Sequence, residues 1–179
     1  MPNKIFFIFF LLIIVGGPWA WKNLYVPYVA TRSLRERSQE LVQVAKEYRV
    51  TRGISINIPL EVPAGYFLSD ISDPETDPEH KFLLVYRDRF GSELRILESE
   101  GTSLPVREDF YALSKTSGFQ EVSVGPFSGY YARSDPFQDP ERQVLVFLKP
   151  SVKVTITNRP RSGATKLPDS DFLRLARGL

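Results

Sequence analysis

The sequence contains no cysteine and a single histidine, His80. The lack of cysteine excludes disulfides, thiolate nucleophiles, thiolate metal sites and a lipid anchor on cysteine. Zinc sites draw mainly on cysteine and histidine, and this inventory is too small to supply one. A Ser-His-Asp triad would have to use His80, which lies in a polar segment and is expected to be a surface residue.

Known catalytic motifs are also missing. The chain has no Gly-x-Ser-x-Gly elbow, no glycine-rich phosphate loop and no His-Glu-x-x-His pair. Two groups of carboxylates remain. Glu98 and Glu100 are two residues apart on an expected strand and share a face, as a glycosidase pair would, although any charged strand end shows this. The other group could offer oxygens to Ca²⁺ but lacks the turn glycine of a calcium loop, and it consists of Asp70, Asp73, Glu75, Asp77 and Glu79.

We therefore predict no catalytic, cofactor-binding or metal-binding residues and expect a protein that is not an enzyme. The rival hypothesis is a hydrolase that works with carboxylates alone, with Glu98, Glu100 and Asp77 as its candidates. The acidic segment is instead expected to be a solvated loop.

The net charge is only +2, but the charges are unevenly distributed. Residues 61–109 contain 12 acidic and 5 basic residues, whereas the rest of the chain contains 9 acidic and 18 basic residues. Both basic ends suit an anionic membrane surface. The loop Arg159-Pro160-Arg161 with Lys166 could bind lipid or a polyanion, but nucleic acid would need more clustered charge interleaved with aromatic residues, so no nucleic-acid partner is expected.

One long uncharged run is present, at the N-terminus. Ile5 to Trp21 span 17 positions without a charge. A helix over them would be roughly 25 Å long, near the lower limit for crossing a bilayer. Trp19 and Trp21 lie at its far end, where amphipathic aromatics favour the headgroup level. We expect a cytoplasmic tail over residues 1–4 and a retained transmembrane anchor over residues 5–21.

Two other interpretations of the run stay open, namely a cleaved signal peptide and a buried helix of a soluble domain. Cleavage after Ala20 would place Pro18 at the third position back, and cleavage after Gly17 would leave Pro18 next to the scissile bond. Orientation signals conflict, because several positive residues come after the run and positive residues favour the cytoplasmic side: Lys22, Arg32, Arg35 and Arg37. A signal-like segment at the extreme N-terminus usually exports the chain after it, so we expect the domain outside.

The next segment is predicted to be an aromatic linker over 23–30 and then an amphipathic helix from Ser33 to Arg49. Ser33 and Glu36 fit a capping box. An apolar stripe at helical spacing is expected to pack on the domain, and its members are Leu34, Leu41, Ala45 and Tyr48. The linker and helix together occupy residues 22–52.

From residue 53 the pattern is mainly that of strands. Alternating or apolar runs predict strands over 54–58, 65–68, 82–86, 94–98, 120–124, 129–133, 142–148 and 152–158. Helices are expected over 107–115 and at the C-terminus after Asp169 or Ser170 as N-cap. Tyr130, Tyr131 and Phe127 are expected to pack on the sheet. Short turns between the strands predict an α+β domain over 53–179, with an antiparallel sheet of six to eight strands and helices packed on one face.

Five segments carry a resemblance to a known family: Pro63-Ala64-Gly65-Tyr66, Leu83–Tyr86, Gly125 with Gly129-Tyr130-Tyr131, Val144–Phe147 and Leu167–Leu179. They resemble an uncharacterised extracytoplasmic domain of Gram-positive anti-sigma-factor-like membrane proteins, and more distantly envelope lipoprotein-sorting and stress-sensor domains. The resemblance covers Pro63 to Leu179 and implies a sheet-plus-helix domain without catalytic residues. Anti-sigma members carry a cytoplasmic domain before the membrane helix, whereas only Met1 to Lys4 precede it here, so sigma-factor binding of that kind is not expected.

These observations lead to two functional hypotheses. The first is a non-enzymatic, single-pass, membrane-tethered binding or sensory domain of the bacterial envelope, whose partner is an envelope protein, peptide or lipid. The alternative is an accessory structural subunit of a membrane protein complex, docked through the helix Ser33–Arg49.

Overall fold

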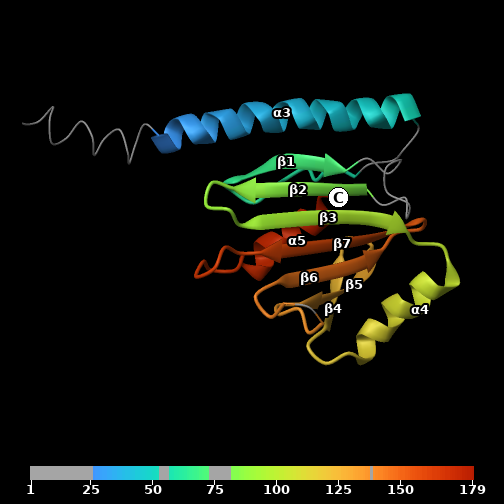
Figure 1. Ribbon diagram of the computed structural model, residues 1–179. Helices are drawn as coiled ribbons and strands as arrows, with labels where there is room; N and C mark the ends of the chain where they lie inside the picture. The colour runs from blue at the N-terminus through green and yellow to red at the C-terminus, as the bar shows by residue number, and fades with distance from the viewer. Residues whose placement is uncertain (1–25, 53–56, 73–81, 138) are drawn as a thin grey trace, which may run out of the picture.

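The computed structural model describes residues 26–52, 57–72, 82–137 and 139–179 (Figure 1). These residues form an α+β structure, and the elements described within them are seven strands, three α-helices and one short 3-10 helix. In chain order the elements are α3 (Val26–Arg52), β1 (Tyr66–Ser72), β2 (Phe82–Asp88), β3 (Glu93–Glu100), α4 (Leu104–Ala112), η3 (Leu113–Lys115), β4 (Gln120–Val124), β5 (Phe127–Ala132), β6 (Gln143–Leu148), β7 (Val152–Arg159) and α5 (Asp169–Arg177).

All seven strands form one antiparallel sheet in the order β1-β2-β3-β7-β6-β5-β4. It consists of two meanders, β1 to β3 and β4 to β7, which join where β3 pairs with β7. The predicted antiparallel sheet of six to eight strands is confirmed. β2 pairs with β3, β4 with β5 and β6 with β7, each across a short turn, as the short turns between the predicted strands indicate.

Helices lie on both faces of the sheet, so the expectation of helices on one face is wrong. α5 packs on the face that we call the inner face, where Phe172 and Leu175 contact the main core. α4 packs on the opposite, outer face, where Phe110 contacts Tyr130 and Val146. Neighbouring residues on β5 and β6 point in opposite directions, and the runs Tyr130–Ala132 and Val144–Phe147 are apolar and buried, as expected of strands covered on both sides.

Helix α3 runs beside the edge strand β1 (Figure 1). Leu41 is half-buried and Ala45 is fully buried, so the predicted packing on the domain is confirmed for these two residues of the stripe, whereas the side chain of Tyr48 lies outside the described part. The Ser38 hydroxyl also accepts a hydrogen bond from the Leu68 amide of β1 at 3.0 Å. An edge strand offers unpaired backbone groups to other chains, and α3 covers part of this edge.

The boundaries of several predicted elements are wrong. α3 begins at Val26, so residues 26–30 are helical and the predicted linker is shorter. Ser33 therefore lies inside the helix and is no cap, and Glu36 pairs with Arg32 at 2.8 Å. At the C-terminus the N-cap of α5 is Pro168, without a side-chain cap bond, and not the expected Asp169 or Ser170.

The strand expected over 54–58 lies partly outside the described residues, and its described end at 57–58 has no strand pairing. Ile58 instead packs on the main core from an irregular segment. β1 extends to Ser72, so Asp70, the first residue of the acidic segment expected to be a loop, lies on a strand. Within the described part of the chain, no helix has the length and apolar character needed to cross a membrane.

Candidate functional site: a cleft on the outer face of the sheet

A cleft of about 340 Å³ opens on the outer face of the sheet. Its floor is formed by β2, β3, β7 and β6, and its wall by Leu113 of η3, Phe119 and the segment between β5 and β6. We call it the sheet-face cleft. α4 covers the β5–β6 part of this face, whereas no described element covers the β2–β3–β7 part, so the cleft lies at the boundary of the covered area.

The floor is set by strand register. Residues that face each other across antiparallel strands point to the same side of the sheet. Three successive rows cross the outer face and become more polar toward the β2–β3 turn. The first row is Leu83, Leu97, Thr155 and Val146, the second is Val85, Arg95, Thr157 and Val144, and the third is Arg87, Glu93 and Arg159. The cleft is thus apolar at one end and charged at the other.

The wall is held by a carboxylate. Asp135 is only 8% exposed, accepts a hydrogen bond from the Phe137 amide at 2.9 Å, and lies 3.9 Å from Arg142. This arrangement presents Phe137 at the mouth of the cleft, where its ring is 64% exposed and 5.9 Å from the Phe119 ring, centroid to centroid. The segment therefore adds an exposed aromatic surface to an apolar floor.

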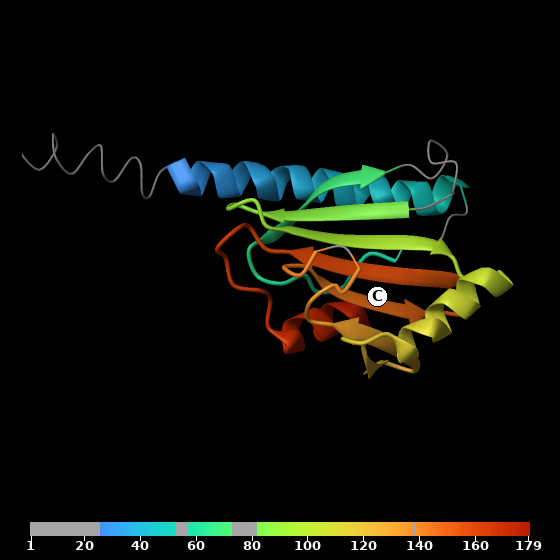
Figure 2. The same cartoon turned by 60° about the horizontal axis from the view of Figure 1, so that its bottom comes forward.

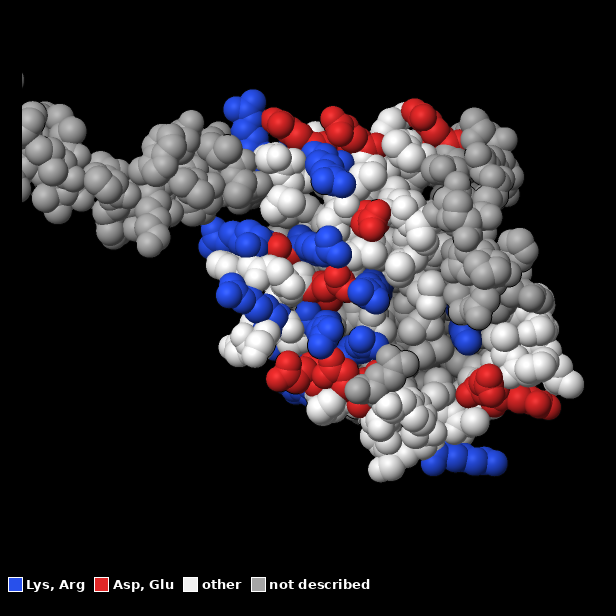
Figure 3. All heavy atoms as spheres, viewed as in Figure 1, with Lys and Arg blue, Asp and Glu red and all other residues white. Residues whose placement is uncertain are grey.

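The charged row has one carboxylate between two guanidinium groups. Glu93 accepts hydrogen bonds from Arg87, at 3.1 Å, and from Arg95, while Arg159 pairs with Asp139 at 3.1 Å. Three arginines thus share two carboxylates on this part of the face. Figure 3 shows basic and acidic side chains intermixed on this side of the molecule. Exposed pairs of this kind contribute little to stability, and an anionic group at Arg95 would add a second partner. The arrangement can bind a ligand with an apolar body and an anionic end.

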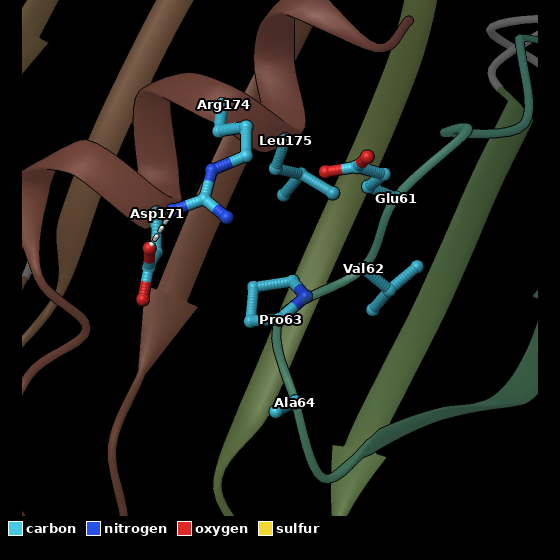
Figure 4. A pocket seen from close by; sticks show the side chains of 7 residues that line it. All are labelled: Glu61, Val62, Pro63, Ala64, Asp171, Arg174 and Leu175. Atoms are coloured by element: carbon cyan, nitrogen blue, oxygen red, sulfur yellow. Dashed lines mark hydrogen bonds and ion pairs between the residues drawn. The ribbon is translucent and has the colours of Figure 1, made fainter.

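A second, more polar cleft of about 280 Å³ lies between α5 and residues 61–64 (Figure 4). Arg174 points into it and pairs with Asp171 at 2.5 Å, while Glu61 lines the opposite side. The guanidinium already has a carboxylate partner within its own helix. This cleft therefore has little unmatched charge with which to select a ligand.

A chain of buried hydrogen bonds crosses the inner face from β1 to α5. The Tyr66 hydroxyl donates to Asn158, Asn158 donates to Gln143, Gln143 donates to the Tyr131 hydroxyl, and Tyr131 donates to Asp169 at 2.7 Å. Asn158 and Gln143 are fully buried. Burial raises the pKa of both Tyr66 and Tyr131 to about 12, so the hydroxyls stay protonated as donors. The chain joins four strands to the last helix and is structural.

A second buried polar group lies near the C-terminus. Glu98 is 5% exposed on the inner face and accepts a hydrogen bond from the Asn57 amide at 3.3 Å. Lys149 donates to the Asn57 side chain at 2.9 Å and to the main-chain oxygen of Leu179 at 2.8 Å. Burial raises the pKa of the Glu98 carboxyl, and hydrogen bonds from Asn57 and the charge of Lys149 offset this only in part. Burial also lowers the pKa of Lys149.

The carboxylates singled out in the sequence do not form a site among the described residues. Glu98 is enclosed on the inner face, on the other side of the sheet from the sheet-face cleft, and the side chain of Glu100 is outside the described part. Asp70 is exposed on β1 and accepts from the next amide, that of Ile71. His80 and the remaining acidic candidates, Asp73, Glu75, Asp77 and Glu79, lie outside the described residues. In the described part of the chain no three potential metal ligands cluster.

The basic and aromatic candidates are placed clearly. Arg159 and Arg161 are exposed, whereas the Lys166 ammonium donates to the main-chain oxygens of Arg133 and Pro140 and is used in holding the segment before β6. The expected packing of three aromatic residues on the sheet is confirmed, with Tyr130 and Tyr131 buried and Phe127 half-buried on the core. On α3, Leu41 and Ala45 also pack against the domain.

No pattern in the sequence indicates a role for Arg95, Leu97 or Val146. Alternation along β7 predicts that Thr155 points to the polar face, and this is the one usable signal. The cleft itself depends on the pairing of β3 with β7. These strands are about fifty residues apart in the sequence, and no local pattern predicts their pairing.

Comparisons with protein-family models, curated proteins and solved structures found no match to this chain. The resemblance to the anti-sigma-factor-like extracytoplasmic domains therefore stays a prediction, and function has to be argued from the geometry.

Proposed function

We propose that this protein is a non-enzymatic binding domain of the bacterial envelope, tethered to the membrane by residues 5–21, that holds a peptide or lipid in the sheet-face cleft. The observation that carries the proposal is the cleft itself, about 340 Å³ in volume, with an apolar floor and Arg95 at one end. Small-ligand sites have this character, with mostly apolar linings and a few polar groups that fix orientation, and this cleft lies at the small end of their size range.

The rows of the outer face give the ligand a direction. Its apolar part would lie over Leu97 and Val146, and its anionic group, such as the carboxylate of a fatty acid or of a peptide C-terminus, would lie at Arg95. Burying apolar area supplies affinity, and the guanidinium, which binds carboxylates in a fixed planar geometry, supplies selectivity. The enclosure of Glu98 on the opposite face supports a binding role for the cleft rather than hydrolysis by that carboxylate.

Photochemical labelling tests the proposal without knowledge of the natural ligand. Full-length protein in detergent is irradiated with a fatty acid that carries a diazirine on its chain, or with a short peptide that ends in photo-leucine. Labelled peptides are then identified by mass spectrometry. We expect at least one of the two probes to label the segments of β3 and β6 that contain Leu97 and Val146, because these residues form the floor.

Two tryptophan variants provide the comparison. Thr155→Trp places a large ring on the floor and should abolish this labelling. Ser123→Trp makes a tryptophan at an exposed position of β4, outside the cleft, and should leave it unchanged. Labelling of β3 and β6 that survives Thr155→Trp, or a lack of labelling there with both probes, would contradict binding in the cleft.

A further inference from the structure

Exposed arginines from three distant parts of the chain gather at one end of the domain. α3 begins at this end, the β2–β3 turn lies there, and β7 ends there (Figure 1 and Figure 2). We call this the basic end, and its exposed arginines are Arg32, Arg35, Arg37, Arg87, Arg89, Arg159 and Arg161. By contrast, α4 and η3 at the opposite end carry two basic and two acidic residues, which cancel.

Most of the carboxylates at the basic end are already occupied. Glu36 pairs with Arg32, Glu93 with Arg87, and Asp139 with Arg159. The carboxylate of Asp88 accepts hydrogen bonds from the Phe90 and Ser92 amides and so closes the turn. Among the described residues no carboxylate pairs with the four other arginines of this end, which are Arg35, Arg37, Arg89 and Arg161. The basic end thus carries an excess of exposed cationic groups.

An aromatic side chain projects from the same end. Phe90 occupies the tip of the β2–β3 turn and is 55% exposed, and the Arg89 guanidinium lies 4.5 Å from its ring centroid. An exposed aromatic beside arginines is the combination that settles at a membrane interface, where the ring is buried at headgroup level and the cation meets phosphate.

The position of the apolar N-terminal run is limited by chain length. Val26 begins α3 at the basic end, and only residues 22–25 separate it from Trp21. Even a fully extended chain covers only about 17 Å over these five steps. If residues 5–21 anchor the protein, the basic end is therefore the part of the domain nearest the bilayer, within reach of a surface potential that extends about a Debye length, roughly 8–10 Å.

We propose that the basic end docks on anionic lipid, with Phe90 at the headgroup level and Arg35, Arg89 and Arg161 contacting lipid phosphates, so that the domain is held end-on against the membrane. The inference rests on the proposed tether, which brings this end to the bilayer. The partner is a lipid surface and not a soluble polyanion, because an aromatic tip and a nearby attachment point contribute nothing to binding a soluble polyanion.

Because the chain has no cysteine, single labels test the docking. Full-length Phe90→Cys, and Tyr111→Cys on α4 as the matched exposed site at the opposite end, carry an environment-sensitive fluorophore. Each is reconstituted into vesicles of phosphatidylcholine, alone or mixed with phosphatidylglycerol, that contain a lipid with a headgroup-level nitroxide quencher. We expect position 90 to be quenched strongly in the anionic vesicles and less in the zwitterionic ones, and position 111 to be quenched in neither.

Charge variants show whether the arginines cause the docking. The combined change Arg35→Gln, Arg89→Gln and Arg161→Gln alters three exposed side chains. It should lower the affinity of the basic end for anionic vesicles by about fivefold per charge removed. High salt should also lower this affinity. Equal quenching at positions 90 and 111, or no quenching at position 90 in protein that floats with the vesicles, would overturn the docking. If soluble polyphosphate, without anionic lipid, changed the signal of the label at position 90 as much as anionic vesicles do, lipid docking would be overturned in favour of binding to a soluble polyanion.

Flotation separates this inference from the tether. Protein that leaves the vesicles after an alkaline carbonate wash overturns the anchor over residues 5–21. Quenching of position 90 by anionic vesicles added to that unanchored protein would still support docking of the basic end, whereas quenching that does not depend on phosphatidylglycerol would overturn it.

Discussion

Two tyrosine hydroxyls on the inner face are almost equally buried but have opposite surroundings. Tyr131 is 2% exposed and has two hydrogen bonds, as donor to Asp169 and as acceptor from Gln143. Tyr86 is 3% exposed, and its hydroxyl has no hydrogen-bond partner among the described residues. Burial alone raises the pKa of Tyr86, as expected of a hydroxyl without such a partner.

The same chemical change should therefore have opposite effects at these positions. Tyr131→Phe removes two hydrogen bonds, one of them to a carboxylate, and should lower the free energy of unfolding by about 2 kcal/mol. Tyr86→Phe removes a polar group that was desolvated without compensation and should raise it by about 1 kcal/mol. Urea denaturation of the two variants and the wild type measures both effects. Destabilisation of similar size in both would show that Tyr86 has a partner.

Glu98 should make stability depend on pH with a defined sign. Burial raises its pKa above the unfolded value of about 4.5, so the folded protein binds this proton more tightly than the unfolded chain does. Stability is then lost as pH rises from 4.5 through the raised pKa, because the carboxylate must ionise inside the core.

Glu98→Gln keeps the oxygen that accepts from Asn57 and removes the ionisation. We expect the urea midpoint of this variant, relative to wild type, to increase as pH rises across that range and to level off above it. Asp70→Gln is a suitable control, because Asp70 is exposed on β1 and the substitution neutralises only a surface carboxylate. A midpoint difference that falls with rising pH would mean that Lys149 outweighs burial and lowers the pKa of Glu98.

At the scale of elements, the sequence predicts the features that local patterns encode. Hairpins such as β6–β7 are predicted correctly because alternation and a short turn lie within one segment. The pairing of β3 with β7 and the placement of α4 and α5 on opposite faces are not, because both depend on which faces of distant strands are apolar. The capping box at Ser33 is misleading, because α3 begins at Val26 and Ser33 therefore lies inside the helix instead of at its start.

The contact of α3 with β1 is testable through one hydroxyl. Ser38→Ala removes the acceptor of the Leu68 amide and should destabilise the edge strand by about 1 kcal/mol. If β1 opens locally, its amide exchange should become about fivefold faster while that of β6 and β7 stays the same. Hydrogen exchange monitored by mass spectrometry measures this. Ser33→Ala, an exposed site on the same helix, should change neither, and an equal effect of both would show that the hydroxyl contact is unimportant.

At the scale of the whole molecule, the two proposals fit one arrangement. The charged row of Arg87, Glu93 and Arg159 lies at the basic end. Leu97 lies four residues after Glu93 on β3, about 13 Å away. A domain docked by its basic end would therefore hold the sheet-face cleft just above the headgroups, with its charged end toward them. The sequence shows two basic ends of the chain, but only the fold shows that arginines from both lie at one end of the domain.

The side of the membrane that the domain occupies decides which partners it can meet. Tyr111→Cys gives the cysteine-free chain one reactive site on the surface of α4, where the wild-type Tyr111 is 60% exposed. We expect a membrane-impermeant maleimide to label it in intact cells, because signal-like N-terminal segments usually export the chain that follows them. Ala132→Cys, at a fully buried site, should react only after denaturation and controls for unfolded protein.

Labelling of Tyr111→Cys only after the cells are permeabilised would place the domain inside. Lys22, Arg32, Arg35 and Arg37 would then act as a positive-inside signal. Docking of the basic end would remain possible on that side, where the cytoplasmic leaflet is rich in anionic lipid. The peptide or lipid in the cleft would in that case have to come from the cytoplasm, so this experiment determines in which compartment the ligand should be sought.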